Sequence, residues 1–312
     1  NSTFNGNSAN NNGGGMYNNY SSPSVSNTTF SGNKTNYYGG GMYNFFSSPK
    51  ITNSTFWGNT AAFGGGMSNN SSSLLINNST FWENTANSSG GGIFNNSSSP
   101  SISNSTFSGN AANNNGGGMY NLISSSPSIS NSTFNGNRAN DGGGMSNFSS
   151  SSPSISNSAF WGNTANDGGG MYNDDSSPSI SNSTFSGNAA TSSGGGMYND
   201  YSFPSISNTT FSGNIAFEGG GMYNVSAASP NINNTVFYGN TATTGRDIDG
   251  NIYNTSAHNA SDGSGGGINS GTGFINLSLS GVTSSTLFVN PADPDGPDNI
   301  WRTADDGLVP AA

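Results

Sequence analysis

The chain has 312 residues, a net charge of −10, only 6% charged residues and no cysteine. Five Lys and Arg side chains cannot neutralise a phosphate backbone, so the composition argues against nucleic acid and anionic membrane surfaces as partners. The lack of cysteine excludes disulfides and thiolate metal sites, and without a run of about 18 apolar residues the sequence predicts no transmembrane segment.

One phrase of sequence recurs ten times at intervals of about 26 residues. Its first copy is Asn1-Ser-Thr-Phe4-Asn-Gly-Asn7. The later copies begin at Asn27, Asn53, Asn78, Asn104, Asn131, Asn157, Asn182, Asn208 and Asn234. A fixed period of this size indicates a solenoid, in which each repeat buries its apolar side chains against the repeats before and after it.

Alignment of the copies separates constant positions from variable ones. In chain order, a repeat has a Phe, an Asn three residues later, a small residue that is often Ala, three consecutive Gly residues, a Met or Ile, a second Asn and a Ser-Ile-Ser segment. Equivalent residues stack in a solenoid, so we expect the apolar ones to form buried ridges and the Asn side chains to form hydrogen-bonded ladders.

The predicted structural ladder is represented by Phe107, Asn110, Met119, Asn121, Ile129 and Asn131. We expect this ladder to bury the Asn that opens each repeat. The Asn-Ser-Thr triplets at Asn53 and Asn104 are therefore interpreted as products of the repeat and as poor glycosylation signals. Insertions fall in the serine-rich stretch around Ser125, which predicts an outward loop there.

Short alternations of apolar and polar residues, such as Met-Tyr-Asn, have the period of a strand, and Gly, Asn, Ser or Pro bounds each of them. Three consecutive Gly residues oppose a helix by about 1 kcal/mol per residue. The several Leu of a leucine-rich repeat and the Gly-Asp spacing of calcium-binding nonapeptide repeats are missing. We predict an all-β, right-handed parallel β-helix of about ten coils, with three short strands per coil.

The repeats divide the chain into two parts. We expect β-helix repeats over residues 1–244 and a C-terminal irregular, capping or linker segment over residues 245–312. Adjacent coils lie about 4.8 Å apart, so ten coils predict a rod roughly 50 Å long. The chain begins inside a repeat, without Met or a signal sequence, which predicts a mature or excised fragment of a longer protein.

The Phe-x-Gly-Asn and Gly-Gly-Gly-Met motifs, in about nine successive coils, resemble the FxxN and GGA[ILV] repeats of chlamydial polymorphic outer membrane proteins and related bacterial β-helix surface proteins. Gly245-Arg-Asp-Ile-Asp-Gly250 and Asp295-Gly-Pro-Asp298 resemble the end of large secreted β-helix proteins with a C-terminal anchoring region. The resemblance implies an extracellular or cell-surface location in a bacterium, with adhesion or surface display. The chain departs from the chlamydial pattern in having no Cys.

These features predict an extracellular structural or adhesin-like protein, a rigid spacer or stalk whose outer face carries its function. Open β-helix ends expose strand edges that pair with another strand. We therefore expect either end-to-end self-association into filaments or a longer parent protein. A glycan or another cell-surface ligand is the partner that an adhesin predicts.

Parallel β-helices also include polysaccharide lyases and hydrolases, which need two positioned carboxylates, or acids that hold Ca²⁺ beside a base. Asp141 and Asp167 occupy the same position in neighbouring coils, before the Gly triplet, and Glu218 shares this column. Other coils have uncharged residues there, so we predict no enzyme. A polysaccharide-binding or polysaccharide-degrading protein is the alternative. A second acidic patch, interpreted as solvated turn residues, consists of Asp174, Asp175 and Asp200.

The tail contains the candidate cofactor site and the single histidine. Asp293, Asp295 and Asp298 offer oxygen ligands at the spacing of a calcium-binding loop, although the bidentate Glu of an EF-hand is missing. They form a candidate calcium site, with a solvated linker as the alternative. His258 lacks Ser and Asp partners at the spacing of a catalytic triad and is interpreted as a turn residue.

Three tyrosines follow the Met column at outward positions: Tyr120, Tyr172 and Tyr198. They are candidate surface contacts, which either cover turns or stack against a sugar. Outward Ser and Thr residues at coil spacing also raise ice binding as a further alternative, although Ser dominates and Lys50 and Asn231 interrupt the array.

Overall fold

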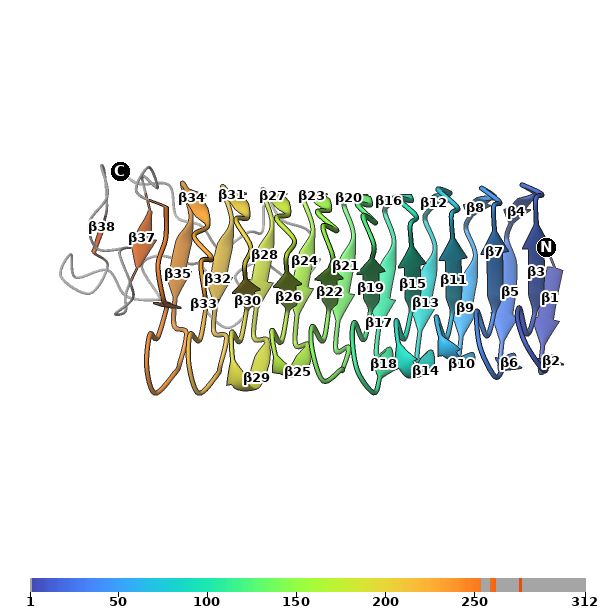
Figure 1. Ribbon diagram of the computed structural model, residues 1–312, viewed down its shortest axis with the longest axis horizontal. Coiled ribbons are helices and arrows are strands. Elements are labelled where there is room, and N and C mark those ends of the chain that lie inside the picture. The colour runs from blue at the N-terminus through green and yellow to red at the C-terminus, as the bar shows by residue number, and fades with distance from the viewer. Residues whose placement is uncertain (1, 254–258, 262–274, 277–312) are drawn as a thin grey trace.

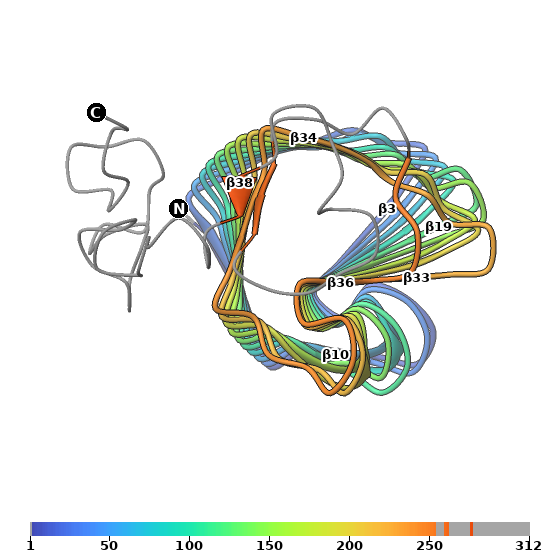
Figure 2. The same cartoon turned by 90° about the vertical axis from the view of Figure 1, so that its left-hand side faces the viewer.

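The computed structural model describes residues 2–253, 259–261 and 275–276, and these residues wind into a rod of stacked coils (Figure 1). Seen along the rod axis, successive coils superimpose on one another (Figure 2). Each strand pairs in parallel with the equivalent strand of the next coil, so Phe107 lies beside Phe134 and Ile102 beside Ile129. The stacking predicted from the period is confirmed.

A coil passes in chain order through four sheets, here named A, B, C and D. Sheet A contains β1 (Ser2–Asn5), β5 (Thr28–Ser31), β9 (Thr55–Trp57), β13 (Thr80–Trp82), β17 (Thr106–Ser108), β21 (Thr133–Asn135), β24 (Ala159–Trp161), β28 (Thr184–Ser186), β32 (Thr210–Ser212), β35 (Val236–Tyr238), β37 (Ala260–Ser261) and β38 (Ile275–Asn276). Sheet B is interrupted: it contains β2 (Ser8–Ala9), β6 (Lys34–Thr35), β10 (Thr60–Phe63), β14 (Thr85–Ser89) and β18 (Ala111–Ala112), and then β25 (Thr164–Asp167) with β29 (Ala189–Ser193).

The other two sheets are continuous through the described coils. Sheet C contains β3 (Met16–Asn19), β7 (Met42–Phe45), β11 (Met67–Asn70), β15 (Ile93–Asn96), β19 (Met119–Leu122), β22 (Met145–Phe148), β26 (Met171–Asp174), β30 (Met197–Asp200), β33 (Met222–Val225) and β36 (Ile248–Asp249). Sheet D contains β4 (Ser24–Ser26), β8 (Lys50–Thr52), β12 (Leu75–Asn77), β16 (Ser101–Ser103), β20 (Ser128–Ser130), β23 (Ser154–Ser156), β27 (Ser179–Ser181), β31 (Ser205–Ser207) and β34 (Asn231–Asn233).

The three strands predicted per coil correspond to sheets A, C and D, and sheet B adds a fourth strand in some coils only. Sheet B covers the variable segment before the Gly triplet, where single bridges such as Asn115 with Asp141 replace strands in several coils. No helix occurs in the part of the chain that the structure describes, and thus none long and apolar enough to cross a membrane.

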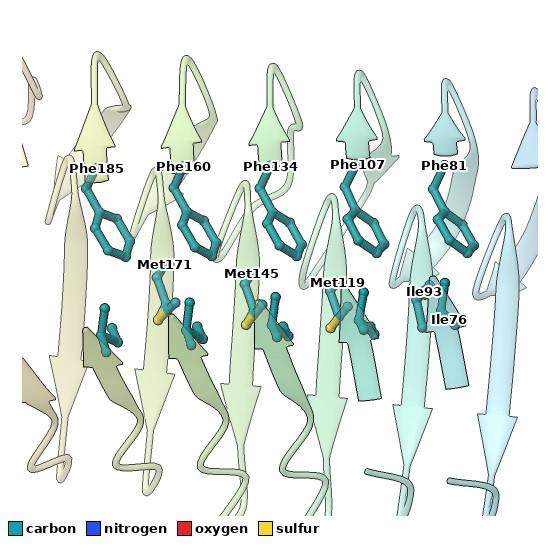
Figure 3. Packing of buried hydrophobic residues seen from close by; sticks show 14 of the residues in the cluster. Ile76, Phe81, Ile93, Phe107, Met119, Phe134, Met145, Phe160, Met171 and Phe185 are labelled. Carbon is teal, nitrogen blue, oxygen red and sulfur yellow. The ribbon is translucent and has the colours of Figure 1, made fainter. Parts of the chain in front are cut away.

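The interior is filled by one column of side chains from each sheet. Phe rings from sheet A stack from Phe4 to Phe237 with centroids 4.5–4.9 Å apart and planes within 8° of parallel. Figure 3 shows this row beside the Met residues of sheet C. The Phe, Met and Ile residues of the middle coils are almost fully buried, and each such side chain stabilises the fold by roughly 1.5–3 kcal/mol.

Two buried ladders of Asn side chains run parallel to the apolar columns. In the first, which includes Asn110, each Oδ1 accepts from both the backbone N–H and the Nδ2 of the equivalent Asn one coil earlier. In the second, which includes Asn121, each Nδ2 donates to the next Oδ1 at 2.8–2.9 Å. Since these amides are removed from water, the ladders satisfy polar groups that would otherwise be buried without partners.

Two serine ladders, which sequence reasoning did not predict, lie at the corners of the coil. Between sheets D and A, Ser132 Oγ accepts the backbone N–H of Ser105 at 3.2 Å and donates to the carbonyl of Ser130 at 2.8 Å. Between sheets C and D, Ser125 Oγ accepts the backbone N–H of Ser98 at 3.0 Å. Ser124 and Ser126 are exposed outside the strands, as predicted for an outward loop, but Ser125 between them is fully buried, so the prediction is wrong for this residue.

The Asn that opens each repeat is not in a buried ladder. Asn131 is exposed and adopts a left-handed backbone conformation, with φ of 48°, and Asn53 and Asn104 share both properties. Asn tolerates this conformation at a tight turn better than most residues. The predicted burial of this column is wrong, because the corner between sheets D and A turns the Asn outward and the following Ser inward.

The Gly triplet forms the sharp corner between sheets B and C, visible in Figure 2 where the chain turns towards the centre at β36. A Cβ at Gly143 would lie 2.5 Å from the carbonyl oxygen of Thr164 and 2.6 Å from that of Gly169, both in the next coil. Real Cβ atoms do not approach that closely, so glycine is required for the backbones of adjacent coils to meet here.

The parallel pairing continues past residue 244. Ile248 lies in register with Met222 and is fully buried in the Met column. Asp247 is also buried, and its carboxylate accepts hydrogen bonds from Asn240 Nδ2, at 2.9 Å, and from Ser261 Oγ. The Asn110-type ladder therefore ends on a carboxylate that accepts the last amide.

Candidate functional site

The outer face of sheet C carries a row of aromatic side chains, because the residue after each Met points away from the core. The row consists of Tyr17, Tyr43, Ser68, Phe94, Tyr120, Ser146, Tyr172, Tyr198 and Tyr223. Seven of these nine positions are aromatic. The row includes all three tyrosines that the sequence analysis selected as candidate surface contacts.

Tyr172 and Tyr198 stack with centroids 4.7 Å apart and planes 6° from parallel. The other face of Tyr172 stacks on Phe148 at 5.3 Å, and the other face of Tyr198 approaches Tyr223 at 5.4 Å. Sugar stacking needs a free ring face, and neither tyrosine offers one. These residues present ring edges and hydroxyl groups to solvent, while Tyr120 is almost entirely buried.

Neighbouring rings fill the gap where the row contains a serine. Ser146 is fully buried, and its hydroxyl has no hydrogen-bond partner among the described residues. Phe148, two residues later on the same face, packs edge-on against Tyr120 at 5.8 Å and stacks on Tyr172. The aromatic surface is therefore continuous across the serine.

Acidic residues flank the aromatic row in the second half of the rod. Asp174 and Asp200 lie in register on the same face of sheet C as the tyrosines. Burial raises the pKa of Asp174, and the charges of Asp200 and Asp175 raise it further. Burial, with smaller contributions from Asp174 and Asp141, raises the pKa of Tyr120 to about 12. Tyr120 therefore stays protonated at neutral pH.

The predicted carboxylate column is assembled as expected from its spacing. Asp141 and Asp167 form a parallel bridge in adjacent coils, and Ser193 separates them from Glu218. Asp167 Oδ1 accepts the backbone N–H of Ser193 at 3.0 Å, and its other oxygen accepts Asn166 Nδ2 at 2.9 Å. Asp167 is thus part of the coil-to-coil bonding, and a catalytic role for this column stays a prediction.

The candidate calcium ligands Asp293, Asp295 and Asp298 lie outside the described residues, and so does His258. Across residues 2–253, 259–261 and 275–276, no group of three or more His, Asp or Glu side chains is placed to hold a metal ion. The candidate calcium site in the tail stays a prediction.

Comparison with known proteins bears on the fold. A family model described as "Right handed beta helix region" matches residues 67–242, which is more than half of the chain. The chain belongs to this family. No curated protein and no solved structure matches it significantly. Membership of the right-handed β-helix family agrees with the coils and ladders described above, and the closer resemblance to chlamydial surface proteins stays a prediction.

In the coils of this right-handed β-helix that the structure describes, apolar columns and hydrogen-bonded ladders fill the interior, so the side chains available to a ligand lie on the outer faces. These faces differ in character. Sheet C presents tyrosine edges and carboxylates, sheet D presents the paired serines of each Ser-Ile-Ser segment, and sheet A presents Thr with Ser, Asn or Trp. The serine rows are the outward residues that raised ice binding in the sequence analysis, whereas the tryptophans of sheet A were not selected as contacts from sequence.

Proposed function

We propose that this right-handed β-helix is an extracellular, structural or adhesin-like protein of a bacterial cell surface. The observation that carries the proposal is the in-register stacking of the Phe rings from Phe4 to Phe237, accompanied by hydrogen-bonded Asn and Ser ladders. Such a stack resists bending because each coil is tied to its neighbours by backbone and side-chain bonds. It holds outer side chains at fixed repeats, as a stalk or display surface requires.

Low charge and abundant outer hydroxyl and amide groups support a role in water outside the cell. The resemblance of the FxxN-type and Gly-Gly-Gly-Met repeats to those of chlamydial and related bacterial surface proteins supports the same proposal. Labelling of intact source cells with a membrane-impermeant amine reagent tests it, because Lys34 and Lys50 are exposed on the rod. Labelling before lysis is expected; labelling that occurs only after lysis overturns the surface location.

End-to-end assembly is part of the proposal. Successive coils pair through the same parallel sheets, so a second copy whose strands paired with the first coil would continue those sheets. Negative-stain microscopy of the purified chain separates two forms. Fibres of uniform width support assembly, whereas discrete short rods at all concentrations exclude it and leave the stalk role.

Two alternative functions have a specific feature in their favour. The in-register carboxylates of Asp141 and Asp167 favour polysaccharide cleavage, and the paired Ser rows of sheet D, as at Ser101 and Ser103, favour ice binding. Release of reducing or unsaturated ends from a polysaccharide panel, lost in the Asp141→Asn, Asp167→Asn double variant, would favour the enzyme. Thermal hysteresis of the purified protein would favour ice binding, and both alternatives fail if neither activity is measured.

A further inference from the structure

Two tryptophans stand side by side on the outer face of sheet A. Trp57 on β9 and Trp82 on β13 lie in register one coil apart, with ring centroids 5.7 Å apart and planes 19° from parallel. They are 44% and 43% exposed, which is unusual for the side chain with the largest apolar surface. Ser31 and Ser108 are their neighbours in the coils on either side. The pair is therefore an isolated aromatic platform bordered by small hydroxyl residues.

The carboxylate of Glu83 lies beside this platform, and the backbone of Glu83 adopts an unfavourable left-handed conformation. Nine of the ten repeats have Gly after the outward residue of sheet A, always with positive φ, and the remaining repeat has Glu83 at φ of 51°. A residue with a Cβ pays roughly 1–2 kcal/mol in this conformation. At the equivalent Gly58 a Cβ would meet no atom within 4 Å, so packing does not forbid a side chain, and backbone strain is the cost.

Glu83 lies against the tryptophan pair. Its Oε2 accepts a hydrogen bond from Trp57 Nε1 at 3.2 Å across one coil. Glu83 is itself exposed, so this bond leaves the other carboxylate oxygen accessible from solvent. A surface hydrogen bond of this kind contributes little to stability, and it does not account for the replacement of a stabilising glycine. Strained residues that persist without a structural gain are candidates for a binding role.

We infer that Trp57, Trp82 and Glu83 form a binding site for a neutral, extended polysaccharide. The C–H face of a pyranose ring is weakly positive and packs on the negative face of an indole, and sugar hydroxyls donate to a carboxylate in charge-assisted hydrogen bonds. The two indoles stack on each other, so each ring covers one face of its partner. A sugar ring can therefore pack only on the opposite face of either indole, where the neighbour in the next coil is a small serine, Ser31 or Ser108.

The negative charge of the chain favours a neutral polysaccharide over an acidic one. The chain carries a net charge of −10, and the charged group of the platform is a carboxylate, so an acidic glycan would be repelled. Ser108, Thr55 and Thr80 offer hydroxyl groups at the edge of the platform, whereas Ser31 is buried and its hydroxyl donates to Asn5 Oδ1. A second copy of the chain could occupy the platform only with a surface complementary to it. The hydroxyl groups around the indoles favour a sugar over such a protein partner.

This inference gives a ligand class for the adhesin-like function and rests on that proposed function. Binding by the purified chain is nevertheless measured independently of where the protein lies in the cell. Binding of cellohexaose, chitohexaose and xylohexaose to the full chain is measured by isothermal titration, with an oligogalacturonate of similar length as the acidic comparison. We expect at least one neutral oligosaccharide to bind and the oligogalacturonate not to bind. Trp57→Ala and Trp82→Ala should each weaken binding roughly tenfold or more.

Two further variants distinguish a binding role from a structural one. Glu83→Gly restores the residue of the other repeats, so it should raise the thermal midpoint while weakening binding several-fold. Trp161→Ala removes the third tryptophan of the same sheet, which follows the platform by three coils and precedes a glycine, and should leave binding unchanged. Stabilisation together with weaker binding is not explained by damage to the fold.

The proposal is overturned if no neutral oligosaccharide binds, if the tryptophan variants bind as well as the original chain, or if Glu83→Gly leaves affinity unchanged. Association of the chain with itself that Trp57→Ala abolishes, without any sugar binding, would assign the platform to a contact between copies instead. Failure of surface labelling with intact sugar binding would overturn the cell-surface function and leave the site standing.

Discussion

Asn110 and Asn137, one coil apart, share two hydrogen bonds: Asn137 Oδ1 accepts the backbone N–H of Asn110 at 2.9 Å and its Nδ2 at 3.0 Å. Asn110 Nδ2 also donates to the carbonyl of Phe81 in the preceding coil, at 2.9 Å. One buried side chain therefore ties three successive coils together. Water cannot replace these bonds, because Asn110 has no exposed surface.

Replacement of Asn110 by Ala should be among the most damaging single changes to a polar residue of the rod. It removes the acceptor of the Asn84 backbone N–H and Nδ2 and the donor to Phe81. We expect the free energy of unfolding to fall by about 2–5 kcal/mol, measured by chemical denaturation. Asn104→Gly, which changes an exposed Asn of the same repeat, should cost less than about 0.5 kcal/mol. Equal losses in the two variants would contradict the ladder.

The ladder that contains Ser132 predicts different losses of stability for two serines that lie two residues apart. Ser132→Ala leaves the backbone N–H of Ser105 and the carbonyl of Ser130 without their hydroxyl partner, and should cost about 1–3 kcal/mol. Ser130→Ala alters an outward hydroxyl of sheet D and should change stability by about 0.5 kcal/mol or less. Thermal denaturation of both variants checks the difference, and a costly Ser130→Ala with a silent Ser132→Ala would reverse the assignment.

Two glycines of one coil should respond differently to Ala. At Gly143 the added Cβ would collide with backbone oxygens of the next coil at 2.5 and 2.6 Å, so Gly143→Ala should prevent adjacent coils from closing. At Gly136 the Cβ meets no atom within 4 Å, and only the left-handed conformation, with φ of 60°, opposes it. We expect Gly136→Ala to fold with a loss of roughly 1–2 kcal/mol and Gly143→Ala to lose its β-sheet circular dichroism. A folded Gly143→Ala variant of near-normal stability would contradict the close contact.

The buried tyrosines predict a loss of stability in alkali. The pKa of Tyr120 is raised from 10.0 to about 12 in the folded chain, while the unfolded chain ionises near the ordinary value. Between these two pH values the unfolded state binds fewer protons than the folded one, so the free energy of unfolding falls as pH rises. We expect tyrosinate absorbance to appear together with the loss of β-sheet circular dichroism. Tyr120→Phe should reduce the decline, and tyrosinate formation in a fully folded rod would contradict it.

The paired aspartates of sheet C predict the opposite of ordinary acid denaturation. The pKa of Asp174 is raised by burial, by Asp200 and by Asp175. Its folded pKa exceeds its unfolded pKa, so its favourable contribution is present at low pH and is lost as pH rises through the folded pKa. Asp200→Asn removes one of two like charges in register and should stabilise the rod by about 0.2–1 kcal/mol at pH 7.

The same variant provides a control, because the gain should vanish at a pH low enough to protonate Asp174, whose pKa is raised. Thermal midpoints of the two proteins across this range provide the measurement. A gain of equal size at low and neutral pH would show that the change acts through packing and not through charge.

Some features of the outer face could not be read from residue type. Tyr172 and Tyr198 were recognised as outward from the alternation of sheet C, but their stacking at 4.7 Å removes the free faces on which sugar stacking depends. The more open platform is formed by Trp57 and Trp82. A signal for it did exist in the sequence: Glu83 is the single departure from Gly in its column. The link between Glu83 and the tryptophans is visible only in the hydrogen bond to Trp57, which lies about one repeat away along the chain.

The sequence by itself determined the period, the parallel stacking and the apolar columns, because a residue type repeated at one position must meet its own copies one coil away and only a buried position keeps Phe constant in all ten repeats. The tertiary structure decided which polar columns face inward. Asn131 and Ser132 are both polar and almost constant in their columns, yet the left-handed turn at Asn131 directs one outward and buries the other against the backbone of the preceding coil. That choice depends on backbone geometry and on a hydrogen-bond partner one coil distant, neither of which residue type specifies.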